Sequence, residues 1–310
     1  MKILTLCLVL ITGLCLCACL PVSAAGEETI DLSSLMITLN PTESPSESGS
    51  VAAASVNDNY PIPVDQAKNN IRVFAGNMDI DPVLAGTGTM PIGNYYYFSV
   101  NNSVYYVNQN SGVVEFAMMT QNMPDTGVLS LSRDQAYEMG KEFARTNYGS
   151  FDQKNWKIIA EQQYNTSWYR MNGTEREYYS VPLFLFTLRE EQQHVLTPST
   201  INLYVNAVDG KVIYYSGVDR LLLVNLTPSI TLGRAVEVAG EHFEYETTHS
   251  TAYLSVITRP MNVQSLAWIV TLRGTHGDHE HEENFVIDAV SGEYISRYYD
   301  NIWPEGYSNY

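Results

Sequence analysis

The segment His276 to Glu283 carries the densest group of side chains that could do chemistry. Its sequence, His-Gly-Asp-His-Glu-His-Glu-Glu, places three of the six histidines, His276, His279 and His281, in a predicted loop between two strands. Neutral imidazoles with carboxylates suit zinc, nickel or copper, and His279 and His281 would share one face of a strand. A metal site also needs ligands held in fixed directions, which a loop does not supply. We therefore predict a solvated hairpin tip, with a metal-binding sensor as the alternative.

Motifs for enzyme chemistry are missing from the sequence. There is no His-Glu-x-x-His zinc motif, no Gly-x-Ser-x-Gly elbow and no phosphate-binding loop. The stretch Gly86-Thr87-Gly88 lacks a strand-to-helix context and is predicted to be a turn. The adjacent pair Glu190-Glu191 is predicted to be solvated. We expect no catalytic residue and no cofactor, so the chain is not predicted to be an enzyme.

A short hairpin pattern occurs three times. An apolar strand end is followed by Asn or Asp, two further residues, Ser or Asp, a Gly and a second β-prone run, in Val107–Val114, Val205–Val212 and Ile287–Tyr294. The Gly supplies the positive φ that a tight turn needs, and the leading Asn or Asp can cap the turn. We predict capped turns at Asn108, Asn206 and Asp288.

An amphipathic helix is predicted upstream of each hairpin. Asp65-Gln66-Ala67 and Asp134-Gln135-Ala136 match outright, and Ala235 occupies the corresponding place in the third copy. Ser132 with Gln135 makes a capping box, and Pro63 suits the first turn of the first helix. Between helix and hairpin the sequence is rich in Tyr, Val, Ile and Phe.

The predicted class is therefore α+β, with three tandem units that each pack one helix on an antiparallel meander. We place the units at residues 61–124, 128–219 and 226–300, followed by a tail at 301–310.

Paired tyrosines recur among the 22 tyrosines of the chain. In a strand, successive side chains point to opposite faces, so one ring of each pair is predicted to enter the core while the other stays wet. The wet rings could form a platform for a polypeptide or a sugar, or serve only as half-buried strand formers. A tyrosine on an edge strand would also suit strand addition by a partner peptide.

The amino-terminal segment indicates export. Lys2, an apolar run and a small-residue site predict a signal peptide over residues 1–24, and no second apolar stretch predicts a membrane span. All four cysteines lie in this segment, and Leu16-Cys17-Ala18-Cys19 resembles a lipobox whose Cys19 would be lipidated. Residues 25–60 are acidic and Ser/Pro-rich, which predicts a disordered tether. The expected location is extracytoplasmic, either secreted or lipid-anchored.

Charge and sequons add further expectations. The formal net charge of −17 disfavours nucleic acid and anionic membrane surfaces as partners and leaves cationic partners open. Asn101, Asn165 and Asn172 each begin an Asn-x-Ser/Thr pattern at a predicted turn. They are candidate glycosylation sites or chance matches.

The helix with its early Ala, the strands and the closing hairpins at Val205–Val212 and Ile287–Tyr294 resemble the PepSY family of extracytoplasmic domains. The first unit departs from the pattern, with Asn108-Gln109 in place of Asp-Ala. The resemblance implies a non-catalytic module found in propeptides of thermolysin-type peptidases and in cell-surface proteins, where it is thought to restrain proteases. The expected partner is an extracellular peptidase or another polypeptide. The alternative is a purely structural surface protein.

Overall fold

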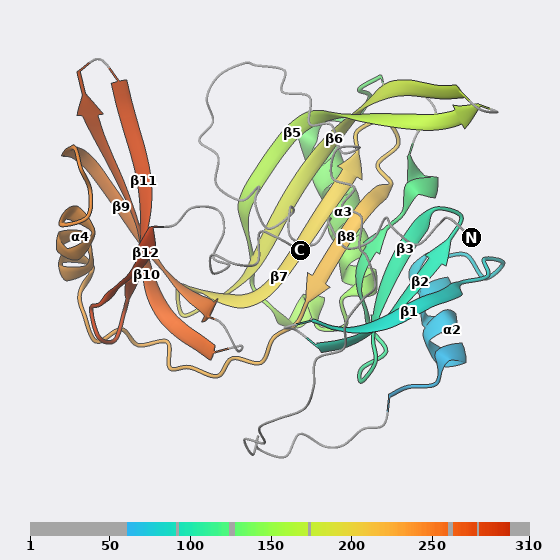
Figure 1. Cartoon of the computed structure of the whole chain (residues 1–310), viewed down its shortest axis with the longest axis horizontal. Helices are drawn as coiled ribbons and strands as arrows, with labels where there is room; N and C mark the ends of the chain where they lie inside the picture. Colours follow the sequence, from blue (N-terminus) through green and yellow to red (C-terminus); the bar gives the residue numbers. More distant parts are fainter. Residues whose placement is uncertain are drawn as a thin grey trace, which may run out of the picture.

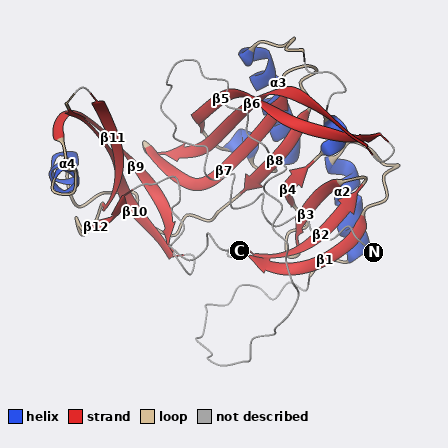
Figure 2. Ribbon diagram, turned by 45° about the horizontal axis from the view of Figure 1, so that its top comes forward, coloured by secondary structure: helices blue, strands red, loops and turns tan. Residues whose placement is uncertain are grey.

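The protein is a mixed α+β molecule made mostly of sheet (Figures 1 and 2). The computed structural model describes residues 61–90, 93–123, 128–172, 175–259, 263–277 and 279–297, without the side chains of residues 164 and 167–179. Its α-helices are α2 (Val64–Phe74), α3 (Arg133–Asn147) and α4 (Leu232–Gly240), and two short 3₁₀ turns are η3 (Thr120–Asn122) and η4 (Phe151–Gln153). No helix in these ranges is long and apolar enough to cross a membrane.

Twelve strands pair as one branched sheet. They are β1 (Val83–Met90), β2 (Gly93–Val100), β3 (Ser103–Asn108), β4 (Val114–Met118), β5 (Trp156–Asn172), β6 (Glu175–Gln192), β7 (Val195–Asn206), β8 (Val212–Val218), β9 (Glu246–Arg259), β10 (Val263–His276), β11 (His279–Asp288) and β12 (Tyr294–Arg297). Strands β1 to β4, β5 to β8 and β9 to β12 each follow one another as antiparallel neighbours.

Two of these four-stranded sets join edge to edge. Strand β4 pairs antiparallel with β8, so β1 to β8 form one continuous surface. The third set meets the second through two parallel residue pairs between β7 and β9, Val195 with Leu254 and Leu196 with Ser255. The Arg189 guanidinium reinforces this joint, because it donates to Ser255 Oγ at 2.9 Å and to the Val256 carbonyl at 3.1 Å.

Local sequence explains where the helices start. Ser132 Oγ accepts from the Gln135 amide at 3.3 Å while the Ser132 amide donates to Gln135 Oε1 at 2.9 Å, which confirms the predicted capping box. Thr231 Oγ1 accepts from the Arg234 amide at the start of α4. Pro63 stands one residue earlier than predicted, at the N-cap of α2 rather than inside its first turn.

Each helix is seated by an alanine four residues after its N-cap. Ala67, Ala136 and Ala235 are all 0% exposed, and their small side chains let the helix backbone approach the strands closely. Helices α2 and α3 share one core on the same side of the β1–β8 sheet, where Phe74 contacts Phe143 and Tyr215 edge-on at 5.4 and 5.2 Å between ring centroids. Helix α4 has its own core against β10 and β11.

The three hairpin turns are built alike, as predicted. Asn108, Asn206 and Asp288 each accept, through Oδ1, from the amides two and three residues ahead. The following glycines, Gly112, Gly210 and Gly292, have φ of 74°, 75° and 78°, a conformation that strains any residue with a Cβ.

The turns also hold the helix starts. The carbonyls of Gln109, Ala207 and Ala289 accept from amides just before the N-caps of α2, α3 and α4. Each closing turn therefore fixes the place where its helix begins.

The predicted alternation of buried and wet tyrosines is wrong for Tyr95-Tyr96, which are 1% and 9% exposed, and for two further pairs. Tyr105 and Tyr106 are 0% and 1% exposed, and Tyr214 and Tyr215 are 3% and 0% exposed. Tyr105 and Tyr215 lie in the core under α2 and α3, whereas Tyr106 and Tyr214 belong to a second apolar cluster on the opposite face of the sheet. Both faces exclude water here, so neither ring of a pair stays wet. The side chains of Tyr178 and Tyr179, and residues 298–299, lie outside the described residues.

Two expected turns are strands. Gly86-Thr87-Gly88 lies inside β1, paired with Tyr95–Tyr97 of β2. Asn165 lies in β5 opposite Pro182. In both places, pairing with a neighbouring strand overrides weak local β-propensity.

Candidate functional site

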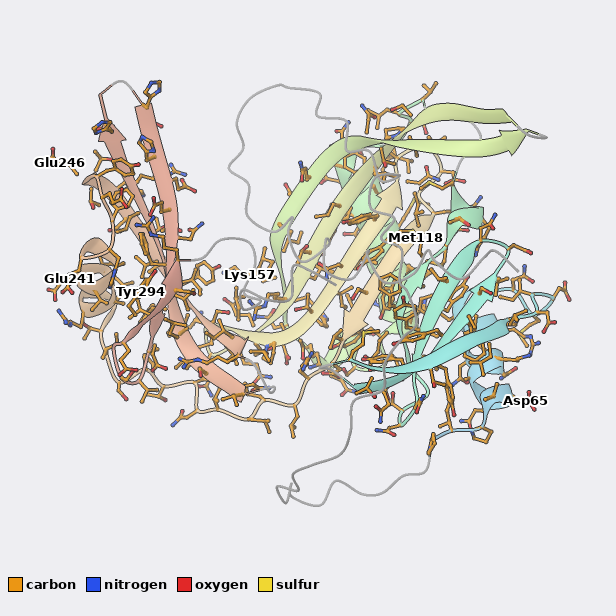
Figure 3. All side chains as sticks on the ribbon, in the orientation of Figure 1. Asp65, Met118, Lys157, Glu241, Glu246 and Tyr294 are labelled. Carbon is orange, nitrogen blue, oxygen red and sulfur yellow. The ribbon has the colours of Figure 1, made fainter. Side chains whose placement is uncertain are left out.

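Strand β1 is the least protected strand at a sheet edge. Among the described strands, β1, β5 and β12 pair with only one neighbour each. Strand β5 carries Lys157 and Glu161, and β12 carries Arg297, as Figure 3 shows for the labelled Lys157. Strand β1, Val-Leu-Ala-Gly-Thr-Gly-Thr-Met, has no charged residue and no proline, and Val83 and Leu84 are 58% and 38% exposed. Edge charges and prolines are the usual protection against strand addition, and β1 lacks both.

At the outer edge of β1, two threonines direct their backbone N–H and C=O groups away from β2. The Asn94 carbonyl accepts from the Gln109 amide at 2.8 Å, so the backbone groups of Asn94 point away from β1. Its partner Thr89 is then a non-hydrogen-bonded position of the β1–β2 ladder, and by alternation Thr87 is another. The N–H and C=O groups of Thr87 and Thr89 therefore point outward from the sheet.

A tyrosine from β2 lies across the glycines of β1. A Cβ built on Gly88 would stand 2.3 Å from Tyr97 Oη and 2.8 Å from Tyr97 Cε2, so the phenol fills the space that a side chain at position 88 would take. Gly86 is also next to this ring, at 3.9 Å from Cδ2. Burial raises the pKa of the Tyr97 hydroxyl, which therefore stays protonated at neutral pH.

Tyr97 is the outermost ring of an aromatic row that crosses the sheet. Successive centroids are 4.6 Å apart for Tyr97 and Tyr106, 4.8 Å for Tyr106 and Phe116, 5.2 Å for Phe116 and Tyr214, and 4.8 Å for Tyr214 and Tyr204. These rings come from β2, β3, β4, β8 and β7. Packing at these distances restricts the movement of each ring, so the row holds Tyr97 in place through its contact with Tyr106.

A half-buried carboxyl braces the strands next to this edge. Tyr95 Oη donates to Glu115 Oε2 at 2.5 Å, and Asn108 Nδ2 donates to Glu115 Oε1 at 3.0 Å. Burial raises the pKa of Glu115, although the hydrogen bonds from Tyr95 and Asn108 oppose the shift. The trio links β2, β3 and β4 and leaves β1 as the only strand of its set outside it. We assign it a bracing role.

The predicted histidine loop is largely strand. His279 and His281 belong to β11, and His276 is the last residue of β10, directly opposite His279. The His281 ring stacks on Tyr245 at 4.0 Å between centroids. Within the described residues, no three His, Cys, Asp or Glu side chains are grouped so that they could hold a metal ion. Asp278 lies outside the described residues.

Glu190 of the pair Glu190-Glu191 is not solvated as predicted, whereas Glu191 is partly exposed. Glu190 is 5% exposed and accepts from Lys154 Nζ at 2.9 Å and Thr197 Oγ1 at 2.9 Å. Lys154 also contacts Asp219 Oδ1 at 2.9 Å. Burial alone would raise the pKa of Glu190, but these hydrogen bonds lower it. The cluster ties the chain after η4 to β6 and β7, and a charge-paired cluster of this kind is structural.

The sequons differ in their surroundings. Asn101 is exposed in the turn between β2 and β3 with a φ of 46°, but Ser103 of its sequon is fully buried and bonded to Thr120 Oγ1 at 3.1 Å. Asn165 is half-buried in β5, and Asn172 ends that strand with its side chain undescribed. Cys19, the signal segment and the tether lie outside the described residues.

Sequence reasoning missed β1 because glycines at 86 and 88 indicate a turn. The available signal was its composition. Val83 to Met90 is an uncharged run with threonines at alternate positions, placed just before the Tyr-rich strand β2.

The fold and the site define a mixed α+β protein with an open, uncharged sheet edge. No family model matches the sequence, and no curated protein matches it either. Among solved structures, the chain is similar to the Bacillus megaterium YpeB C-terminal domain, at 15% identity and a TM-score of 0.46, over 76% of this chain and 97% of that one. The similarity is distant, and we transfer no residue role from it.

Proposed function

We propose that this protein is a non-catalytic, extracytoplasmic binding protein whose strand β1 accepts an extended polypeptide segment as an additional strand. The observation that carries the proposal is the outer edge of β1, eight residues long, without charge or proline, with outward backbone groups at Thr87 and Thr89. Such an edge is a template for main-chain hydrogen bonding to a partner.

The repeated architecture supports a binding role. Each of the three sets of strands has one helix, an alanine that seats it and a capped closing turn. We interpret these sets as three PepSY-like units, the first of them divergent. In this proposal the bound segment belongs to an extracellular polypeptide, and a peptidase restrained by the protein is the specific form of partner that the PepSY resemblance implies.

The test uses a substitution that acts on the outer edge alone. Thr87→Pro removes an N–H that points away from β2, so the β1–β2 ladder keeps its hydrogen bonds. Thr87→Val is the matched control, because it retains the N–H and the β-branched shape. The probe is a short fluorescent peptide of alternating Thr and Val, and its binding is measured by fluorescence anisotropy.

We expect the peptide to bind the wild type and Thr87→Val with similar affinity and Thr87→Pro about tenfold more weakly, through one lost hydrogen bond and the bulk of the ring. Equal binding to all three proteins, or to none, contradicts the proposal. A purely structural protein gives the second result. Inhibition of a thermolysin-type peptidase by wild type and not by Thr87→Pro supports the peptidase form.

A further inference from the structure

We propose that the β1 edge selects a polypeptide strand that carries a lysine or arginine facing Tyr97. This inference rests on the proposed function, because it names the side chain that the added strand would present. It concerns the glycine gap in β1 and the aromatic ring beneath it.

Strand β1 has no side chain where the Tyr97 ring lies. Gly86 and Gly88 are on the face of the sheet that carries Tyr97, since they pair with Tyr97 and Tyr95 respectively. The Tyr97 hydroxyl reaches position 88, where an added Cβ would be only 2.3 Å away. The phenol thus reaches over β1 at Gly88, and neither Gly86 nor Gly88 places a side chain between it and a strand alongside.

An added strand would place one of its residues opposite Gly88. A residue opposite Gly88 would have its Cα about 4.5 Å from the Gly88 Cα, because the backbone groups of Gly88 point toward β2, and its side chain would stand on the same face as Tyr97. Its side chain would then lie against the end of the phenol. In an ordinary strand pair the side chain at position 88 would occupy that place.

The charge of the chain favours a cationic side chain at this place. The chain has a formal net charge of −17, and β1 contributes no cation of its own. The Tyr97 hydroxyl oxygen lies at this end of the ring and can accept a hydrogen bond from an ammonium or guanidinium group, whereas the net charge disfavours a carboxylate at the same place. Contact with Tyr106 at 4.6 Å fixes the ring, so little ordering is required on binding.

The test compares Thr/Val peptides that differ only in one central residue: lysine, norleucine or glutamate. The proteins are wild type, Tyr97→Phe, Tyr97→Leu and, as a control at a half-exposed tyrosine of another strand, Tyr253→Leu. We expect the lysine peptide to bind about threefold more tightly than the norleucine peptide, through one hydrogen bond to Tyr97 Oη, and more tightly than the glutamate peptide. Tyr253→Leu should keep this order, and Tyr97→Phe and Tyr97→Leu should lose it while still binding all three peptides.

A lysine preference that persists in Tyr97→Leu, or no preference in wild type, overturns the inference and leaves strand addition at β1 intact. Absence of binding by every peptide overturns the proposed function itself. Gly88→Ala provides a second variant if Tyr97→Leu does not fold, because its methyl group displaces the phenol from the edge. It should reduce the lysine preference, and an unchanged preference counts against the inference.

Discussion

Replacement of Lys154 by methionine should destabilise the protein, because it leaves the buried Glu190 carboxylate without its ion-pair partner. Lys154 Nζ is 2.9 Å from Glu190 Oε2, and the two side chains are only 13% and 7% exposed. Removing one partner of a fully buried pair costs about 3–5 kcal/mol. Here Glu190 keeps hydrogen bonds from Thr197 and Gln192, and the half-exposed Asp219 can be hydrated. We therefore expect a loss of about 2–3 kcal/mol in the free energy of unfolding.

The assay is urea unfolding followed by circular dichroism at pH 7 and at about pH 3, with Lys157→Met as the control. Lys157 is a lysine of the same strand region whose ion pair with Glu191 is exposed, so its loss should change stability by less than about 0.5 kcal/mol. Methionine preserves the apolar stem of lysine in both variants.

The pH dependence follows from Glu190. Its pKa is lowered in the folded protein, so the stabilisation is complete above the unfolded-state pKa of about 4.3 and is lost as the pH falls through the lower folded-state pKa. The deficit of Lys154→Met should shrink in acid for this reason. In a Glu190→Gln background the substitution should cost less than in wild type. A deficit that is the same at both pH values and in both backgrounds would refute the reasoning.

Two further predictions concern the third set of strands and, for comparison, the closing turn of the second set. Gly274→Ala should destabilise the protein by about 3 kcal/mol, because the new Cβ would stand 2.6 Å from the Glu246 carbonyl oxygen. Gly240→Ala in α4 meets nothing within 4 Å and should stabilise the protein by roughly 0.5–1 kcal/mol. Thermal unfolding of both variants checks this order, and a melting temperature of Gly274→Ala equal to or above that of Gly240→Ala contradicts the geometry. Asp288→Ala and Asn206→Ala should each lower the free energy of unfolding by about 1–2 kcal/mol, because each removes the cap of a turn. Burial raises the pKa of Asp288, but the hydrogen bonds from the Ser291 and Val290 amides and the charge of Arg259 lower it overall. Only the Asp288 effect should therefore fade as the pH falls through this lowered pKa. Parallel pH profiles in urea unfolding would count against the carboxylate cap.

The sequence predicted the elements that depend on short-range chemistry. The capping box at Ser132 and the turns at Asn108, Asn206 and Asp288 involve residues no more than a few positions apart, so their hydrogen bonds are encoded locally. The α+β class followed from the same signals combined with the β-prone runs between them.

The candidate site could not be predicted in the same way. Gly86 and Gly88 favour a turn by themselves, and they form a strand because β2 pairs with them and Tyr97 fills the space that their missing side chains leave. The union of β4 with β8 and the burial of Glu190 also join residues far apart in the chain. No local pattern records such partners.

The sequence by itself therefore determined the three closing turns, the capping box at Ser132 and the acidic character of the chain. Tertiary structure alone decided which strand is left at an open edge, because an edge is defined by the absence of a neighbour in space. It also decided that both rings of Tyr105-Tyr106 and of Tyr214-Tyr215 are buried, since alternation fixes opposite faces but not whether water reaches them.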